Sequence, residues 1–408
     1  MSRILLVTTN YWPEPTGIAV YTTDLANILT KDGHEVAVLT SLPHYPWWRI
    51  PEEFKHMGPG QSENGGVRVI RARHIVPSTM NVVQRIRFEF SLWFNLLKVS
   101  KKFGSEEFDL VIACIPTVAA GIVAKSIATR MKIPLGLIVQ DLSGAGAKQS
   151  GLRGGALISK LAERVEGLAL HAADSLVVVS PAMGDVVAQL GVEKNKTSLI
   201  YNYSARSIFA EARLKSREKF GWKNDEFIAI HTGNMGAKQD LGNLILASEY
   251  LPEGSRIKIF LVGHGNQEKD LREMSSAKAN VSVMDAVSDE DYSALLSAAD
   301  LLIVNERSTQ LEMSLPSKLT SYLYSQRPVI AAVPRGGATW KFLDGVASLV
   351  DANSPELLAQ EILKLQKDPA EMKQLSEVGL EFAQRNLSLE VGRNNYRAWV
   401  KKLLIKAV

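Results

Sequence analysis

Short runs of apolar, often β-branched residues alternate along the chain with longer segments whose apolar residues recur at helical spacing. In the first half, the runs that predict buried strands are 4–8, 35–40, 67–71, 109–114, 135–139, 175–179 and 197–200. The alternation pauses after 202 and restarts with 227–231, 256–262, 281–284, 301–304, 329–332 and 347–350. Because strands that alternate with helices form parallel sheets covered by helices, the sequence predicts an α/β protein with two doubly wound, Rossmann-like domains in tandem.

The length of the chain agrees with two domains. Its 408 residues, 46% of them hydrophobic, exceed the size at which a single core keeps growing. We expect one domain over 1–204 and a second over 205–388, with a last helical segment at about 389–408 that packs on one of them. Ligands of open α/β sheets bind at the carboxyl ends of the strands, so the sequence predicts a site in a cleft between the two domains.

Composition and charge indicate the cellular compartment of the protein and the classes of partner that it can bind. The 47 basic residues only slightly outnumber the 43 acidic ones, and a net charge of +4 on so long a chain does not indicate a nucleic acid partner. The single cysteine, Cys114, ends an apolar run and is expected to be a buried, inert thiol in a reducing compartment. No apolar run has the length of a signal-peptide core or of a membrane span, so we expect a cytoplasmic protein.

One segment, 81–103, combines apolar residues at helical spacing with a group of basic residues. The apolar residues are Val82, Ile86, Phe90, Trp93 and Leu97, and the basic ones are Arg85, Arg87, Lys98, Lys101 and Lys102. Aromatic residues flanked by arginine and lysine suit the headgroup zone of an anionic membrane, which would place the protein peripherally at the inner face of the cell membrane. The alternative is an ordinary amphipathic helix whose apolar stripe covers the sheet.

The first strand leads into a loop rich in proline and then into Gly17, which opens a helix. The unpaired N–H groups of a first helical turn bind anions, and a glycine there lets a ligand approach the backbone closely. Gly17 is therefore a candidate phosphate contact, although a glycine at this position also serves a simple turn.

Three loops in the second half carry further candidates for phosphate and nucleotide binding. The strand at 227–231 leads into a glycine-containing loop with Lys238, whose ammonium group would stabilise a leaving diphosphate. Gly263 and Gly265 lie in a similar loop after the next strand, and Ser317 with Lys318 opens a helix just after Pro316. The alternatives are a solvated loop lysine and a simple helix start.

Several common types of active site are absent from the sequence. It has no G-x-G-x-x-G after the first strand, which disfavours a nicotinamide enzyme. It also has no zinc-type cluster of Cys and His, no G-x-S-x-G elbow and no Walker A lysine, which excludes several classes of hydrolase and nucleotidase.

These residues together resemble the family 4 glycosyltransferases of GT-B fold, and in particular the group that includes the colanic acid biosynthesis glycosyltransferases. The resemblance extends over nearly the whole chain. Its most specific stretches are NYWPEPTG at 10–17 with Tyr21 and Thr22, GHEV at 33–36, PHYPWW at 43–48, QDL at 140–142, GNMGAKQ at 233–239, and PSKL at 316–319 with RPV at 327–329.

The resemblance implies a division of labour between the two domains. The second domain would bind a nucleoside diphosphate sugar, the first would bind the acceptor, and the final helix would pack back on the first. The resemblance also implies transfer with retention of anomeric configuration, without a bound metal or any cofactor besides the sugar nucleotide.

The resemblance also assigns roles to single residues. It makes Gly17 a contact of the donor phosphate and Lys238 the cation on the diphosphate. It places the remaining candidates of the second domain near the nucleotide, the phosphates and the ribose: Gly263, Gly265, Ser317, Lys318 and Leu319. Asp141 follows a strand of the first domain and would orient the acceptor or accept its proton. An aspartate that caps a helix is the alternative for that position.

The chain departs from the family pattern at three positions. Asn234 stands where the family commonly has an arginine, so Lys318 is expected to supply the missing positive charge. The two glutamates of the family, separated by seven residues, correspond to Met313 and Ser321, and Glu312 is the candidate for the sugar-facing role after a shift of one residue.

The predicted function is therefore that of a retaining glycosyltransferase. It would move a sugar from a GDP- or UDP-sugar to a saccharide acceptor, one linked to a polyprenyl lipid, in the synthesis of an exopolysaccharide or cell-envelope glycan. Two alternatives stay open at the level of sequence. One is a GT-B sugar-nucleotide epimerase, and the other is a catalytically silent partner in glycan assembly, which the departures at 234, 313 and 321 favour.

Overall fold

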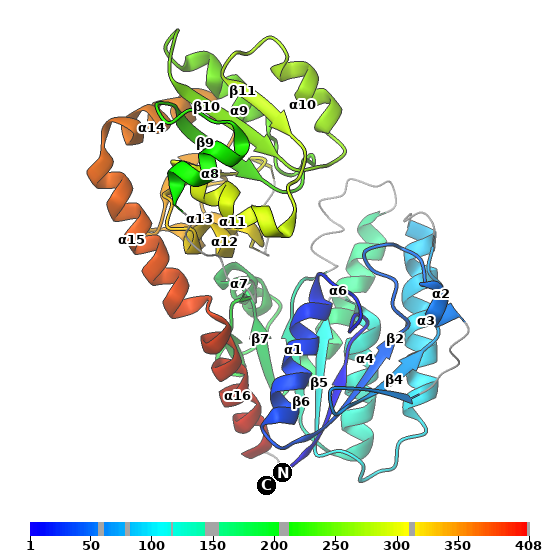
Figure 1. Cartoon of the computed structure of the whole chain (residues 1–408). Coiled ribbons are helices and arrows are strands. Elements are labelled where there is room, and N and C mark those ends of the chain that lie inside the picture. Colours follow the sequence, from blue (N-terminus) through cyan, green and yellow to red (C-terminus); the bar gives the residue numbers. More distant parts are fainter. Residues whose placement is uncertain are drawn as a thin grey trace. The chain divides into compact units, whose positions relative to one another are not determined.

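The computed structural model describes residues 1–55, 61–77, 82–115, 117–142, 155–203, 212–309 and 315–405. The chain divides into two compact units, and Figure 1 shows their elements, labelled where there is room. The first unit comprises Met1–Val179, Met183–Ile200 and Arg393–Val408, and the second comprises Ser180–Ala182 and Tyr201–Gly392. The expected domain boundary at 204/205 lies outside the described residues.

The first unit contains one sheet of eight strands in the order β3-β4-β2-β1-β5-β6-β7-β8. Its strands are β1 (Arg3–Val7), β2 (Glu35–Ser41), β3 (Gln61–Asn64), β4 (Val67–Ala72), β5 (Leu110–Ile115), β6 (Leu135–Val139), β7 (Ser175–Val178) and β8 (Thr197–Leu199). All neighbouring strands are parallel except β3, which pairs antiparallel with β4 at the sheet edge. The central strands are buried on both faces, as expected of a parallel sheet.

The helices of this part of the chain connect its strands. They are α1 (Ile18–Lys31), α2 (Glu52–Lys55), α3 (Val82–Ser100), α4 (Val118–Met131), α6 (Gly155–Ala172), α7 (Pro181–Gln189) and the 3₁₀ helix η1 (Lys194–Lys196). The last helix, α16 (Leu389–Ile405), belongs to the first unit from Arg393 onward. There Arg397 pairs with Asp32 at 2.7 Å, and the indole N–H of Trp399 donates to Ser175 Oγ at 2.9 Å.

The second unit contains a parallel sheet in the order β11-β10-β9-β12-β13-β14. Its strands are β9 (Phe227–Thr232), β10 (Ile257–Val262), β11 (Val281–Met284), β12 (Leu301–Asn305), β13 (Val329–Val333) and β14 (Ser348–Asp351). Its helices are α8 (Arg213–Phe220), α9 (Gly242–Ala247), η2 (Ser248–Tyr250), α10 (Glu268–Ser275), α11 (Asp289–Ala298), α12 (Lys318–Tyr324), α13 (Ala338–Leu343), α14 (Pro355–Lys367) and α15 (Pro369–Asn386). Two of them begin at a side-chain cap, because Ser288 accepts the N–H of Asp291 and Asp368 accepts the N–H of Glu371.

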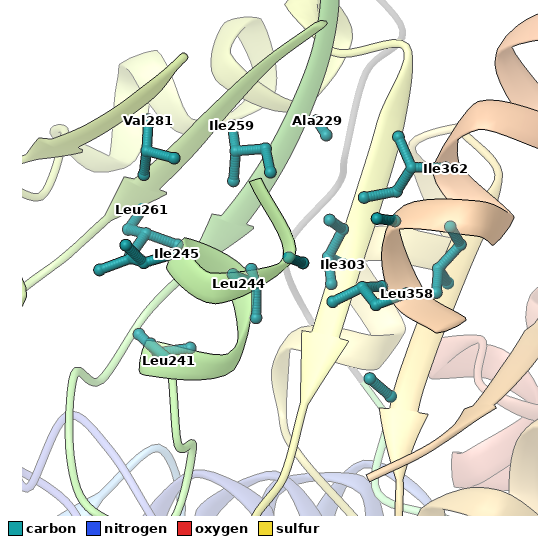
Figure 2. Close-up of a cluster of buried hydrophobic side chains, with 14 of the residues drawn as sticks. Ala229, Leu241, Leu244, Ile245, Ile259, Leu261, Val281, Ile303, Leu358 and Ile362 are labelled. Carbon is teal, nitrogen blue, oxygen red and sulfur yellow. The ribbon is translucent and has the colours of Figure 1, made fainter. Parts of the chain in front are cut away.

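Helices cover both faces of the second sheet, and alternate residues of each strand point to opposite faces. Ala229 of β9 packs on one face with residues of α9 and α14, including Leu244 and Ile362, as Figure 2 shows. Its neighbours Ile228 and Ile230 pack on the other face with residues of α11, α12 and α13. This arrangement confirms the predicted doubly wound architecture, and every strand expected from the sequence is present.

The fold confirms one further expectation and contains one strand that the sequence did not predict. Cys114 is buried in β5, as expected, and burial raises the pKa of its thiol far above the ordinary value. The edge strand β3 was not expected, because its polar residues show no apolar alternation.

Candidate functional site

A small pocket in the second unit lies at the carboxyl ends of two neighbouring strands, β9 and β12. Its volume is about 60 Å³, and it is lined by Lys238, Gln239, Val304, Asn305, Glu306, Pro316 and Lys318. The loop after β9 supplies Lys238, and the first turn of α12 supplies Lys318. The structure thus brings together the two lysines that the sequence singled out for phosphate binding.

Asn305 fixes the loop that carries Lys238. Its buried side-chain amide donates to the carbonyl oxygens of Gln239 at 2.8 Å and Asp240 at 3.0 Å, and its Oδ1 accepts from Asn243 at 2.8 Å. The carbonyl oxygen of Lys238 itself accepts the backbone N–H of Arg307 at 2.9 Å. These bonds tie the loop to the end of β12, so the backbone of Lys238 is placed before any ligand arrives.

Lys318 is half-buried and lies against a buried histidine. Its Nζ is 2.8 Å from Nε2 of His231, a residue of β9, while Nδ1 of the same ring lies 3.0 Å from the carbonyl oxygen of Ile303. Burial lowers the pKa of Lys318 to about 7, and the negative charge of Glu306 opposes this shift. Burial also lowers the pKa of His231 well below its ordinary value, and the charge of Lys318 adds to the effect.

Glu306 provides a carboxylate beside the two lysines. It is buried, its Oε1 accepts the hydroxyl hydrogen of Thr339 at 2.6 Å, and its backbone N–H donates to Ala332 at 3.0 Å. The pocket therefore combines two lysine side chains with one acidic side chain, and both lysines in their charged form would stabilise an anionic ligand.

The glycines of the two loops allow close contact between backbones. Gly263 has a φ of 151°, and a Cβ there would lie 1.9 Å from the carbonyl oxygen of Gly233. A Cβ at Gly265 would lie 2.3 Å from the carbonyl oxygen of Met235. The loops are joined by bonds from Gly233 N–H to Val262 O and from Met235 N–H to His264 O, both 2.8 Å long. Packing of one loop on the other already requires these glycines, and their predicted contact with a nucleotide stays a prediction.

The other predicted residues of the second unit occupy different environments. Asn234 is exposed, and its side-chain amide donates to Gln239 at 3.2 Å. Ser317 is exposed just before α12, whereas the side chain of Leu319 is buried in the core and Ser321 is also buried. The predicted place of Leu319 near the ribose stays a prediction. Glu312 and Met313 lie outside the described residues.

Gly17 and Asp141 belong to the first unit. Gly17 directly precedes α1 with a φ of 67°, and a Cβ there would lie 3.3 Å from the ring of Tyr45. Asp141 is exposed after β6, and its Oδ1 accepts the N–H of Leu142 at 2.8 Å. Residues 143–154, on which the helix-capping alternative depends, lie outside the described residues.

A buried carboxylate, Glu14, organises the loops around Gly17. Its Oε1 accepts the backbone N–H groups of His44 at 2.7 Å and Tyr45 at 2.8 Å, and its Oε2 accepts the side-chain amide of Asn10 at 2.8 Å. The imidazole of His44 packs edge-on against His74, with ring centroids 4.6 Å apart. Burial lowers the pKa of His74 to about 3, with a smaller contribution from His44.

The segment predicted to meet a membrane forms α3, which is apolar on two sides. Phe88, Leu92 and Leu96 are buried, whereas Ile86 and Phe90 are 50% and 61% exposed. The alternative in which the stripe through Ile86 and Phe90 covers the sheet is therefore wrong, because the buried side of the helix is formed by other residues. Within the described part of the chain, no helix has the length and apolar content needed to cross a membrane.

One cluster of possible metal ligands lies outside the pocket. Atoms of His264, Glu268 and Asp285 lie within 4.8 Å of one another. Arg272 donates to Glu268 at 3.0 Å and to Asp285 at 2.6 Å, so both carboxylates are already paired with a guanidinium group.

Sequence reasoning did not identify His231, Asn305, Glu306 or Glu14. The first three were detectable in principle, because each is a polar residue at the end of a predicted buried strand or within two residues after it. Glu14 carries no such signal, since its three partners come from two separate loops.

Comparison with known proteins agrees with this architecture. A glycosyl transferase 4-like domain matches residues 16–203, and the glycosyl transferases group 1 domain matches residues 212–382. The putative colanic acid biosynthesis glycosyl transferase WcaI of Escherichia coli (strain K12) is 28% identical over 404 residues, which are 95% of this chain and 97% of the relative.

Two solved structures share the fold. Sucrose-phosphate synthase from Thermosynechococcus elongatus matches with a TM-score of 0.76 and 16% identity over 100% of both chains. Anabaena HepE in complex with UDP matches with a TM-score of 0.72 and 16% identity over 98% of this chain and 100% of that one. Each unit is an α/β fold built on a sheet of mainly parallel strands, and a pocket lined by lysines lies at the strand ends of the second. With these matches, the chain belongs to the group 1 glycosyltransferases of GT-B fold and is a glycosyltransferase enzyme.

Proposed function

We propose that this enzyme transfers a sugar from a nucleoside diphosphate sugar, a UDP- or GDP-sugar, to a saccharide acceptor. The observation that carries the proposal is the meeting of Lys238 and Lys318 in one pocket. Two further findings support it. Structures of HepE were solved with UDP, with UDP-glucose, and with UDP and glucose, and the relative from E. coli is named for colanic acid biosynthesis. The product would be an exopolysaccharide or cell-envelope glycan, built on a polyprenyl-linked acceptor.

The proposed reaction breaks the bond between the anomeric carbon of the sugar and the diphosphate oxygen. The leaving nucleoside diphosphate keeps the electron pair, and the ammonium groups of Lys238 and Lys318 stabilise the negative charge that develops there. The acceptor oxygen forms the new bond to the anomeric carbon, with retention of configuration, and gives up its proton. We assign that proton to Asp141, and we assign a contact with the donor phosphate to Gly17 before α1.

In the complex the two lysines supply the positive charge that faces the diphosphate, so the proposal includes no metal requirement. The nucleotide would extend from the diphosphate along the loops of Asn234, Gly263 and Gly265. The phosphates would meet the first turn of α12 at Ser317, with Ser321 and Glu312 as the remaining candidates for donor contacts.

A thermal-shift panel of UDP- and GDP-sugars, run with and without EDTA, tests the donor. One nucleotide series should raise the melting temperature whether or not EDTA is present, because a ligand of the native state stabilises it by mass action. Lys238→Ala and Lys318→Ala should each lower kcat for nucleoside diphosphate release by roughly 10²-fold. Lys367→Ala, an exposed lysine of α14, is the matched control. Unchanged turnover in both pocket variants would contradict the assignment.

We further propose that α3 docks on an anionic membrane surface. Its outward side carries Val83, Ile86, Phe90 and Phe94, each at least half exposed, with exposed Arg87 and Lys98 on the same helix. Exposed apolar residues continue beside the helix. Ile75 is attached to it by a bond from its N–H to Ser91 Oγ, and Trp48 contacts Phe88 at a ring-centroid distance of 6.1 Å. An apolar side flanked by basic residues fits acyl chains and anionic headgroups at an interface.

Sedimentation with vesicles tests this docking. The wild-type protein should bind phosphatidylcholine vesicles that contain phosphatidylglycerol, because each basic residue near such a surface contributes about 1 kcal/mol. Changing Arg87, Lys98, Lys101 and Lys102 together to Glu should abolish binding, and Phe90→Ser with Phe94→Ser should weaken it. Leu357→Ser removes an exposed leucine of α14 and serves as the control. Undiminished binding of the charge-reversed variant would rule out electrostatic docking through α3.

A further inference from the structure

A buried titratable group that the proposed transfer reaction does not use lies next to the pocket, in contact with Lys318. His231 is fully buried on β9, and its imidazole lies directly behind the ammonium group of Lys318. A Cβ at Gly233 would lie 3.4 Å from both Cε and Nζ of Lys318, so the glycine leaves room for this lysine. The histidine on one side and the glycine on the other define where the lysine lies.

The contacts of His231 fix its tautomer. The carbonyl oxygen of Ile303 only accepts hydrogen bonds, so Nδ1 carries the hydrogen of the ring. Nε2 then presents a lone pair to Lys318, whose Nζ donates to it over 2.8 Å. A protonated imidazole would instead direct a hydrogen and a positive charge at the ammonium group. The ring therefore acts as a neutral acceptor that orients the lysine.

We propose that His231 is a positioning residue that aims Lys318 at the donor diphosphate, and that Lys318 takes up one proton when the diphosphate binds. The inference rests on the proposed function, because it needs a diphosphate in this pocket. It extends that function by making donor affinity depend on pH.

The direction of the pH effect follows from the environment of Lys318. With a pKa of about 7, this lysine is half neutral near pH 7 in the unliganded protein and mostly neutral above it. A diphosphate favours the charged form and raises the pKa in the complex. Between the two pKa values binding is coupled to uptake of one proton, so Kd rises about tenfold per pH unit above pH 7.

Glu306 and Lys238 are the other charged residues of the described chain that line the pocket. Glu306, after β12, favours the charged form of Lys318, and Lys238, on the loop after β9, is an exposed cation. Because His231 is held neutral, it contributes orientation rather than charge. The pH dependence should therefore belong to Lys318 and not to the pocket as a whole.

Isothermal titration of the full-length enzyme with UDP-glucose and GDP-mannose, from about pH 6 to about pH 8.5, measures both parts of the proposal. For the ligand that binds, Kd of the wild-type protein should rise about tenfold per unit above pH 7. Heats measured in two buffers of different ionisation enthalpy should show uptake of about one proton near pH 8. Both phosphates of a nucleotide sugar are esterified, so the ligand does not titrate in this range.

Four variants separate the roles of the residues. His231→Gln keeps an acceptor toward Lys318 and should retain the pH slope, whereas His231→Asn keeps the bond to Ile303, loses that acceptor and should bind about tenfold more weakly at pH 7. Lys318→Met should bind weakly without a pH slope. Lys238→Met should bind weakly with the slope intact.

The outcomes distinguish this inference from the proposed function. A wild-type Kd that is constant with pH, or a slope that persists in Lys318→Met, would overturn the inference and leave donor binding standing. Equal affinity of His231→Asn and the wild-type protein would overturn the positioning role. Failure of the wild-type protein to bind either nucleotide sugar at any pH would overturn both the donor assignment and the inference.

Discussion

At the scale of residues, His74 shows how one buried side chain of the first unit makes the free energy of unfolding depend on pH in acid. Its ring is buried beside His44, and neither of its nitrogens has a hydrogen-bond partner within the described structure. Its pKa is about 3 in the folded chain, against about 6.5 in an unfolded one. Below pH 6.5 the unfolded chain therefore binds a proton that the folded chain does not.

Stability should accordingly fall by about 1.4 kcal/mol per pH unit between pH 6.5 and pH 3 through His74 alone. His74→Phe fits the neighbouring aromatic rings and removes this titration, so its stability should fall less steeply toward acid. Urea unfolding at a series of pH values, followed by tryptophan fluorescence, measures the two slopes. His264→Phe, at an exposed histidine of the second unit, controls for the loss of a histidine. Parallel slopes in His74→Phe and the wild-type protein would show that another group is responsible.

At the scale of elements, the loops after β9 and β10 pack against each other, and the loop after β9 carries Lys238. Their backbones are joined by the bonds of Gly233 and Met235, and the contact leaves no space for a side chain at Gly263 or Gly265. Gly263→Ala and Gly265→Ala should each displace the loop of Lys238 and lower stability by about 3 kcal/mol or more, as severe backbone overlaps do.

Thermal unfolding and calorimetric titration of the donor would measure stability and affinity on the same samples. Gly254→Ala is the control, because its φ of 72° strains the backbone of an alanine while no atom lies within 4 Å of the new Cβ. It should cost about 1–2 kcal/mol and leave donor affinity unchanged. Full affinity in both loop variants would mean that the position of Lys238 does not depend on this contact.

Most of the strands could be predicted from the sequence. Buried parallel strands are apolar on both faces, so runs such as 227–231 and 301–304 were recognisable, and glycines and lysines at their ends marked the loops. The polar edge strand β3 had no such pattern. The sequence left open whether the apolar stripe of α3 through Ile86 and Phe90 faces outward or covers the sheet, because periodicity shows that residues such as Phe90 and Leu92 are apolar but not which of them meets the sheet.

The candidate site was predictable as a set of residue types but not as a set of contacts. Lys238 and Lys318 were found from local motifs, since each follows a strand or opens a helix. The bond between Lys318 and His231 joins residues far apart in the sequence and depends on how α12 packs beside β9. The shared role of Gly263 and Gly265 likewise needed the position of a second loop.

At the scale of the whole molecule, α16 connects the end of the second unit to the first. Its residues up to Gly392 belong to the second unit, and those from Arg393 pack in the first. The indole of Trp399 lies directly over β6, where a Cβ at Gly136 would come within 2.8 Å of Trp399 and of Leu403. The last helix is therefore part of the core of the first unit, although more than two hundred residues separate it from β6.

A double-mutant cycle should reveal the contact between Trp399 of α16 and Gly136 of β6. Trp399→Leu removes the bond to Ser175 and part of the buried ring, and Gly136→Ala adds a methyl group where the ring lies; each should lower the stability of the first unit by about 1–3 kcal/mol. The double variant should cost less than the sum, by at least about 0.5 kcal/mol, because the smaller leucine leaves room for the added methyl group. Thermal and urea unfolding measure the three values, and Leu357→Ala on α14 is the control for loss of an exposed side chain. Additive losses would show that the ring of Trp399 does not meet Gly136 in solution.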